Sequence, residues 1–332
     1  MPKSISAVAP PHEKAMSEQT GTNAPVTGVE HWTKKGDVRL FLWEKFVDAP
    51  DNKPAVLFVH GSSMASQPTF DLKVAGRADS SVMDWFARRG FVCWSVDMEG
   101  YGRSDKDRDI TCDIANGADD LAAATDYISR TRGVQSFFVY GISSGALRAA
   151  LFAQRHPDRV ARLALDAFVW TGEGSPTLEQ RRKKLPEFLK AKRRPIDRTF
   201  VYSIFERDHP ECADKCVIDA FADAILALDS SMPNGTYIDM CSKLPIVDPA
   251  AITAPTIIMR GEFDGIAGFD DLMNFFTRLR NPDKQFTVMP GISHASFQQK
   301  NYLTVYHILH SFFSRPNPVY LTAALPARRS SA

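Results

Sequence analysis

Cysteine is scarce in this sequence of 332 residues, and no cofactor-binding motif is present. The five cysteines are an odd number at low density, which argues against a disulfide framework and predicts buried thiols. Cys212 and Cys216 stand one helical turn apart, but His209 is the sole further ligand candidate nearby, so we expect no metal. Because the chain has neither a glycine-rich phosphate loop nor a dinucleotide fingerprint, we also expect no cofactor.

An excess of charge of one sign and long apolar runs are also missing. Lys and Arg total 40 against 39 Asp and Glu, so the formal net charge of +1 creates no field for nucleic acid or an anionic membrane. No run reaches the roughly 18 apolar residues of a membrane span. Residues 1–27 contain four prolines and no apolar signal-peptide core. We therefore expect a soluble, cytoplasmic protein with no nucleic-acid partner; no pattern predicts its oligomeric state.

Short apolar runs alternate with segments of helical periodicity along most of the chain. The runs typical of strands span residues 38–46, 54–60, 91–96, 135–140, 160–165, 255–260 and 285–289. Helical patterns span residues 81–89, 119–132, 143–155, 269–279 and 302–313. The run at 38–46 mixes apolar and polar residues, as an outer strand does. The alternation predicts an α/β fold with a mostly parallel central sheet flanked by helices.

The alternation stops between residues 168 and 248, where the sequence is helical, charged and without a clear strand. This segment is too long to be a simple connection in a parallel sheet. We therefore expect a helical cap at 168–248, inserted into a core made of residues 28–167 and 249–316. Residues 1–27 and 317–332 are expected to form flexible tails.

One motif carries recognisable chemistry. Gly141-Ile142-Ser143-Ser144-Gly145 follows a buried strand and precedes a helix, which is the context that Gly-x-Ser-x-Gly requires. The serine of this motif occupies a tight, strained turn, so small residues are needed two positions away on each side. The turn lifts the serine hydroxyl above the sheet and aims the free N–H groups of the helix at the same place.

With this motif in place, the chain resembles the α/β-hydrolase fold family over residues 28–315, as a serine-nucleophile member with a cap. His60-Gly61 follows the first buried strand, where the family has its oxyanion loop, and residues 97–105 resemble its Asp-x-x-Gly-x-Gly-x-Ser turn. The resemblance implies the chain order nucleophile, acid, histidine, with Ser143 as nucleophile. His294 follows the last strand in Pro-Gly-Ile-Ser-His and resembles the family's histidine turn.

The resemblance leaves two positions open for the acid. Asp264 follows the strand at 255–260, which is the usual place, and it is the expected acid. Asp166 ends the strand at 160–165 and is the alternative, because haloalkane dehalogenases of this fold have their acid there. For the oxyanion hole, the resemblance implies the backbone N–H groups of Ser144 and Ser62, with Ser63 as the alternative to Ser62. The further substrate-pocket candidates are His60, Gly61 and Trp170.

Residues 61–79 are expected to form a long loop with no early helix, either lining the pocket or lying on the surface. The expected cap contains a basic run, for which a solvated helix face is the favoured interpretation and recruitment of an anionic substrate the alternative. The basic run consists of Arg181, Arg182, Lys183, Lys184, Lys190, Lys192, Arg193 and Arg194.

A serine nucleophile excludes the dehalogenases and epoxide hydrolases of this fold, which attack with aspartate. The resemblance therefore implies a serine hydrolase that cleaves a small-molecule carboxylic ester or lactone through an acyl-enzyme. The same three side chains also suit amide hydrolysis, carbon–carbon bond hydrolysis of a β-diketone, or acyl transfer to an acceptor other than water. A non-catalytic, ligand-binding member of the fold is the third alternative.

Overall fold

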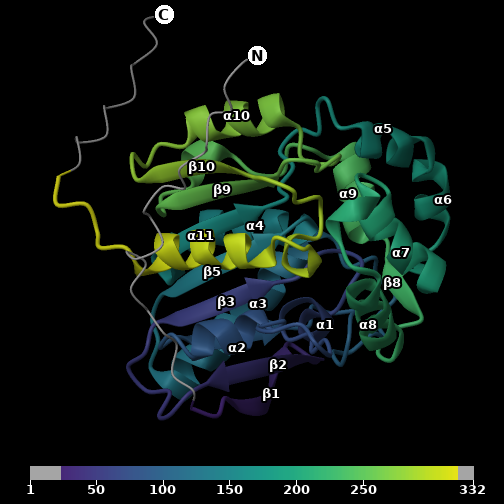
Figure 1. Ribbon diagram of the computed structural model, residues 1–332. Coiled ribbons are helices and arrows are strands. Elements are labelled where there is room, and N and C mark those ends of the chain that lie inside the picture. Colours follow the sequence, from purple (N-terminus) through teal and green to yellow (C-terminus); the bar gives the residue numbers. More distant parts are fainter. Residues whose placement is uncertain (1–23, 321–332) are drawn as a thin grey trace, which may run out of the picture.

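The computed structural model describes residues 24–320, and an eight-stranded sheet runs through its centre (Figure 1). The strand order is β1-β2-β4-β3-β5-β6-β9-β10; β1 and β2 run antiparallel to their neighbours and the other pairs are parallel. The strands are β1 (Thr27–Lys35), β2 (Val38–Phe46), β3 (Ala55–Val59), β4 (Val92–Val96), β5 (Phe137–Ile142), β6 (Val160–Asp166), β9 (Thr256–Gly261) and β10 (Lys284–Met289). The α/β fold predicted from the sequence is thus confirmed. Of the two expected tails, residues 1–23 and 321–332 lie outside the described residues.

The edge of the sheet differs from the prediction. Strand β1 was not predicted, and it pairs with β2 along its whole length, from Thr27 opposite Phe46 to Lys35 opposite Val38. The prediction of an outer strand at 38–46 is therefore wrong, since β2 lies between β1 and β4. Strand β1 is mostly exposed and polar, which is why its sequence carries no apolar run. Its hairpin turns at Gly36, whose φ of 58° suits a two-residue loop.

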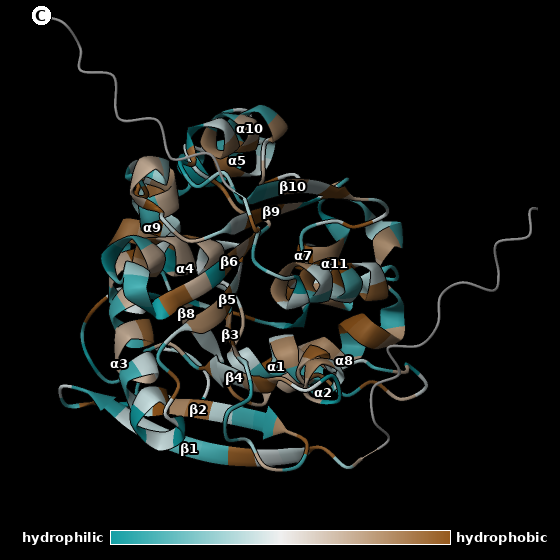
Figure 2. Ribbon diagram, turned by 90° about the vertical axis from the view of Figure 1, so that its left-hand side faces the viewer, coloured by the Kyte–Doolittle hydropathy of each residue, from teal (hydrophilic) through white to brown (hydrophobic). Residues whose placement is uncertain are grey.

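Helices cover both faces of the sheet (Figure 2). Helices α3 and α4 lie on one face, and α2 and α11 lie on the other. Strand β3 shows why, because Leu57 and Val59 point into one hydrophobic cluster while Val56 and Phe58 point into the second. The helices that flank the sheet are α1 (Ser66–Phe70), α2 (Val82–Ala87), α3 (Ile114–Arg132), α4 (Ser144–Arg155), α10 (Phe269–Arg278) and α11 (Tyr302–Ser314).

Two of these helices depart from the sequence prediction. Helix α3 begins at Ile114, five residues before the predicted start, because the Asp113 side chain caps it by accepting from the N–H of Asn116. Helix α1 lies within residues 61–79, where no early helix was expected. The structure describes no membrane-crossing candidate: between residues 24 and 320, no helix is both long and apolar enough for that role.

Residues 168–248 gather beyond the carboxyl ends of the parallel strands (Figure 1). They form helices α5 (Pro176–Lys183), α6 (Leu185–Lys190), α7 (Arg198–Glu206), α8 (Lys215–Leu226) and α9 (Gly235–Ser242). The expectation of no strand here is wrong, because β7 (Arg193–Pro195) and β8 (Ser231–Pro233) pair antiparallel. Each has three residues and contains a proline, so neither is long enough to show an alternating pattern.

The first residues of this segment are hydrogen-bonded to helix α10. The carboxylate of Asp271 accepts the backbone N–H groups of Trp170 at 3.0 Å, Thr171 at 3.0 Å and Gly172 at 3.1 Å. The Trp170 indole donates to the carbonyl of Val247 at 2.9 Å, near the end of the segment. These bonds join the start of the segment to both α10 and the segment's end.

Candidate active site

Ser143 occupies a sharp turn between β5 and α4. Its φ of 58° and ψ of −127° are unusual for a residue with a side chain, and its N–H is tied to the Asp166 carbonyl at 2.9 Å. A Cβ at Gly141 would lie 2.5 Å from the Gly145 carbonyl oxygen. A Cβ at Gly145 would lie 2.5 Å from the His60 carbonyl oxygen. Both glycines are therefore required for the close approach of β5, α4 and the chain after β3.

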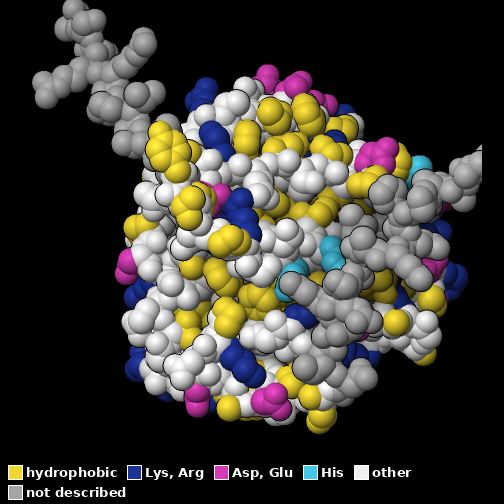
Figure 3. All heavy atoms as spheres, turned by 60° about the vertical axis from the view of Figure 1, so that its left-hand side comes forward, with side chains coloured by type: hydrophobic (Ala, Val, Ile, Leu, Met, Phe, Trp, Pro, Cys, Tyr) yellow, Lys and Arg dark blue, Asp and Glu magenta, His cyan; other side chains and the backbone are white. Residues whose placement is uncertain are grey.

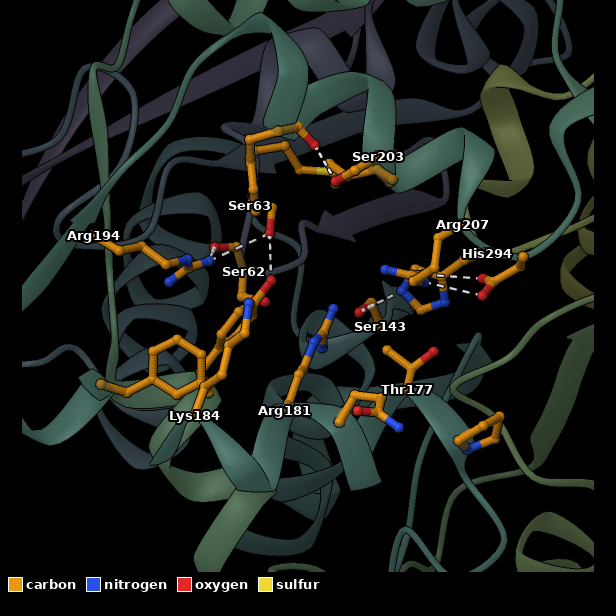
Figure 4. A pocket seen from close by; sticks show the side chains of 18 of the residues that line it. Ser62, Ser63, Ser143, Thr177, Arg181, Lys184, Arg194, Ser203, Arg207 and His294 are labelled. Carbon is orange, nitrogen blue, oxygen red and sulfur yellow. Dashed lines mark hydrogen bonds and ion pairs between the residues drawn. The ribbon is translucent and has the colours of Figure 1, made fainter. Parts of the chain in front are cut away.

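His294 and Asp264 meet Ser143 from the loops that follow β10 and β9, and Figure 4 shows the ring of His294 beside the hydroxyl of Ser143. The Nε2 atom of His294 lies 2.9 Å from Ser143 Oγ, and its Nδ1 atom lies 3.1 Å from each carboxylate oxygen of Asp264. Because a carboxylate only accepts, Nδ1 carries the proton and Nε2 is free to accept from the serine hydroxyl. An imidazole held in this tautomer is suited to remove the proton of Ser143.

The electrostatics of Asp264 favour its charged form. Burial alone would raise the pKa of this carboxyl, but His294 and the N–H groups of Ile266 at 2.8 Å and Ala267 at 3.2 Å lower it from 3.8 to about 2. Asp264 is therefore an anion at neutral pH and stabilises the positive charge that His294 acquires on protonation.

Asp166 has a different environment at the end of β6. Its carboxylate accepts the Tyr140 hydroxyl at 2.6 Å, and His294 lies outside its hydrogen-bonding contacts among residues 24–320. Burial raises the pKa of Asp166 to about 7, and the charge of Asp264 adds to this effect. The structure thus brings Asp264 to the histidine and leaves Asp166 among the aromatic side chains under the turn.

The side chain of His60 acts as a structural link below Ser143. Its Nε2 accepts the N–H of Met98 at 3.1 Å, so its Nδ1 must donate to the Gly61 carbonyl at 2.7 Å. Burial, with the charge of Arg148, lowers the pKa of His60 to about 3. A neutral imidazole with both nitrogens engaged holds the loop in shape and has no free site for a proton.

The chain after β3 is fixed by a buried carboxylate. Asp97 accepts the N–H of Ser66 at 2.8 Å and its hydroxyl at 2.7 Å, which anchors helix α1, and its second oxygen accepts from the Arg103 N–H at 2.9 Å. Helix α1 in turn holds the preceding residues Ser62 and Ser63 beside Ser143. Among residues 24–320, no acceptor takes the backbone N–H of Ser62 or of Ser144, so both remain available to a ligand.

A cavity of about 690 Å³ opens above Ser143 and His294. Its floor includes Ser62 and Ser63, and its apolar lining includes Met64, Phe188 and Phe200. Cationic side chains also line it, from helix α5 and the residue that follows it, from strand β7, and from the residue that follows helix α7 (Figure 4). These cations are Arg181, Lys184, Arg194 and Arg207; the acidic lining residues are Glu187 and Asp208.

Three pocket residues expected from the sequence do not line this cavity. His60 is turned into the link between Gly61 and Met98. Gly61 packs against the turn, where an added Cβ would lie 3.4 Å from the Cβ of Ser143. The Trp170 indole donates to the Val247 carbonyl and packs against Phe275. His60 and Gly61 are expected from their place after the first buried strand, and Trp170 from its place in the expected cap; neither place determines the direction of a side chain.

The basic run divides into residues that line the cavity and residues that do not. Arg181, Lys184 and Arg194 line the cavity; a purely solvated helix face is the wrong interpretation for the half-buried Arg181 and Arg194, whereas Lys184 is exposed. Lining residues that the sequence reasoning missed are Arg207 and Tyr237, for which no local sequence signal exists. The other residues of the run, Arg182, Lys183, Lys190, Lys192 and Arg193, do not line it.

The metal candidates do not converge on one site. His209 stacks on Phe263 with ring centroids 4.1 Å apart, and Cys212 is buried while Cys216 is exposed. In the part of the chain that the structure describes, no group of three or more His, Cys, Asp or Glu side chains could hold a metal ion.

Comparison with known proteins agrees with this architecture. A curated relative, the proline iminopeptidase of Neisseria meningitidis serogroup A, is 25% identical over 188 residues, which cover 53% of this chain and 56% of the relative. The chain thus spans a little more than half the length of that relative. The esterase EaEST from Exiguobacterium antarcticum superposes with a TM-score of 0.66 and 16% identity, over 86% of this chain and 100% of that chain.

Two further solved structures illustrate how varied the similar proteins are. An esterase from Thermogutta terrifontis has a TM-score of 0.61 and 19% identity, over 87% of this chain and 100% of its own. The 2-hydroxy-6-oxo-6-phenylhexa-2,4-dienoate hydrolase of Rhodococcus sp. strain RHA1 has a TM-score of 0.63 and 13% identity, over 88% of this chain and 100% of its own. At these identities the similarity is one of fold. A family model described as serine aminopeptidase, S33, matches residues 50–301, and the chain therefore belongs to this α/β-hydrolase family.

Proposed function

We propose that the protein is a serine hydrolase that cleaves a carboxylic ester or lactone through an acyl-enzyme. The observation that carries the proposal is the 2.9 Å contact between Ser143 Oγ and His294 Nε2, with Asp264 on the other ring nitrogen. This arrangement opens into a cavity large enough for a small-molecule substrate. A serine hydroxyl is a weak nucleophile at neutral pH, and an adjacent oriented base supplies the activation it needs.

The proposed reaction has two halves. His294 takes the proton of Ser143 as its Oγ attacks the ester carbonyl, and the resulting tetrahedral oxyanion accepts the N–H groups of Ser144 and Ser62. Collapse of this intermediate breaks the ester bond, and His294 gives its proton to the departing alkoxide. Water then attacks the acyl-enzyme by the same route, releasing the acid and restoring the serine. Losing one oxyanion donor typically costs on the order of 3 kcal/mol of transition-state stabilisation.

We also propose that residues 168–248 act as a cap that encloses the substrate. In support, Arg194 of β7 donates to the Ser62 carbonyl at 3.0 Å, which joins the segment to the chain beside Ser143. Helix α5 contributes Arg181 to the same cavity, and Lys184, directly after the helix, lines it as well. The segment and the core would then share the substrate, the core supplying the reacting groups and the cap the recognition.

Amide hydrolysis at the N-terminus of a peptide is the second candidate. The family description and the similarity to a proline iminopeptidase favour it. The charge of the cavity argues against it, because four cationic side chains and two carboxylates line the space that a terminal ammonium group would enter. Turnover of L-proline p-nitroanilide, compared with p-nitrophenyl esters, separates the two candidates.

The proposal is tested by fluorophosphonate labelling followed by peptide mass spectrometry, with a series of p-nitrophenyl esters assayed in parallel. We expect the label on Ser143 and turnover of at least the shorter esters, and neither in the Ser143→Ala variant. The variant should keep the melting temperature of the wild type to within a few degrees. Labelling at another residue, or full ester turnover by Ser143→Ala, would remove Ser143 as the nucleophile.

A further inference from the structure

Cations line the cavity above Ser143 without matching carboxylates. Within residues 24–320, no carboxylate forms an ion pair with Arg181, Lys184 or Arg194. Arg207 is different, because Asp208 binds its guanidinium through both oxygens, at 3.0 Å and 2.9 Å. Glu187 is then the one lining carboxylate that remains to balance three cations.

On the face of the molecule that Figure 3 shows, charge is not concentrated in this way. Figure 3 shows one face on which Lys and Arg side chains are scattered among Asp and Glu and among apolar groups. Surface pairs of this kind contribute little, since water screens them. A group of unpaired guanidinium ions inside a cavity is expensive to maintain unless something compensates the charge.

Two of the guanidinium groups are held by one aromatic ring. Arg181 lies 4.3 Å and Arg194 lies 3.7 Å from the ring centroid of Tyr237. Arg194 is fixed further by donating to the carbonyls of Pro233 at 2.6 Å and Ser62 at 3.0 Å, while its buried Nε has no partner among the described residues. The two planar donors are therefore held in place before any ligand arrives.

Tyr237 responds to this local field. Burial alone would raise the pKa of its hydroxyl, but the charges of Arg181 and Arg194, with the Ser63 hydrogen bond, lower it to about 7. The ring and hydroxyl of Tyr237 thus compensate part of the positive charge of Arg181 and Arg194, as a bound anion would. Figure 4 shows Arg181 projecting from α5 into the cavity on the side where Ser143 and His294 lie.

We propose that Arg181 and Arg194 bind an anionic group of the substrate, a carboxylate or a phosphate, while Ser143 reacts with its ester bond. The reaction at Ser143 in this inference rests on the proposed function, whereas the binding of an anion by the two arginines does not. The anion is unchanged by the reaction, and its contact with the arginines is made equally in the ground state and the transition state. Its loss should therefore raise KM more than it lowers kcat.

The experiment compares mono-p-nitrophenyl glutarate with its methyl ester, which has the same chain length and no charge. Wild-type protein should prefer the anionic ester in kcat/KM, and in Arg181→Gln the ratio of the two kcat/KM values should fall about 10- to 100-fold. Arg182→Gln is the matched control, since Arg182 is the next residue on α5, is exposed and does not line the cavity. It should keep the wild-type ratio.

A binding measurement separates this inference from the proposed reaction. Glutarate and inorganic phosphate are titrated calorimetrically into Ser143→Ala and into Ser143→Ala combined with Arg181→Gln. Binding by the first protein and at least tenfold weaker binding by the second support the anion site, and the better of the two ligands identifies its chemistry. Equal kcat/KM for the two esters in the wild type, or no anion binding to Ser143→Ala, would overturn the inference. Anion binding without labelling of Ser143 would instead overturn the proposed reaction alone.

Discussion

Replacing Asp264 by asparagine should leave the fold intact and put His294 in the wrong tautomer. The Oδ1 atom of Asp264 accepts the N–H groups of Ile266 and Ala267 at 2.8 Å and 3.2 Å. The amide oxygen of asparagine would keep these two donors, so its NH₂ group would face Nδ1 of His294. That nitrogen would then have to accept, and the ring proton would move to Nε2, opposite the hydroxyl of Ser143.

The size of this effect follows from the loss of both roles of the carboxylate. A neutral amide neither fixes the reactive tautomer nor stabilises the imidazolium, and loss of the two together typically lowers kcat by about 10⁴. That factor corresponds to about 5 kcal/mol of activation free energy. The pKa of about 2 shows how strongly His294 and the two N–H groups favour the charged carboxyl. Steady-state hydrolysis of a p-nitrophenyl ester measures the effect, and circular dichroism verifies the fold.

Asp166→Asn is the matched control. Asp166 contacts Tyr140 rather than His294, so the Asp166→Asn substitution should change kcat by less than about tenfold. Its raised pKa of about 7 gives a separate check on folding. Because the unfolded carboxyl ionises near pH 4 and the folded one near pH 7, the wild type should lose up to about 4 kcal/mol of stability over that interval, and the variant should not. If Asp166→Asn loses several orders of magnitude in kcat while Asp264→Asn does not, the assignment of the acid is wrong.

Three further predictions concern single positions. Gly145→Ala should lower the free energy of unfolding in urea by several kcal/mol, because its Cβ would lie 2.5 Å from the His60 carbonyl oxygen; an unchanged midpoint would contradict the packing argument. A step in the near-ultraviolet absorbance of tyrosinate should appear near pH 7 and be absent from Tyr237→Phe. Tyrosine titration only near the ordinary pKa of about 10 would show that the arginines do not act on Tyr237. Asp271→Ala should destabilise the protein by about 1–3 kcal/mol and accelerate hydrogen exchange at residues 170–172; unchanged exchange there would refute its anchoring role.

The sequence was most informative where structure is determined by nearby residues. Strand β3 is buried on both faces, so it reads as a continuous apolar run and could be predicted. The turn at Ser143 could be predicted because its tight geometry requires glycine on both sides. Strand β1 could not, because it is an edge strand held by pairing with β2, and its polar residues carry no pattern of burial.

The walls of the cavity were harder to predict, because they depend on how separate helices face one another. Arg181 and Lys184 are three residues apart and lie on the same side of their chain segment, which helical spacing does suggest. Whether that side faces the cavity or the solvent is set by the docking of α5, about which the sequence says nothing. Tyr237 enters the site from α9 and Arg207 from the end of α7, so their proximity is a consequence of tertiary structure alone.

The backbone of Ser143 has a consequence for the evolution and engineering of this chain. A side chain at φ 58° and ψ −127° costs on the order of 1–3 kcal/mol, and glycine would adopt that conformation with little strain. The proposed chemistry needs the hydroxyl of Ser143, but the single substitution Ser143→Gly would relax the backbone at this position. A library selected for thermal stability alone would tend to accumulate inactive variants here, so any such selection should be coupled to an activity screen.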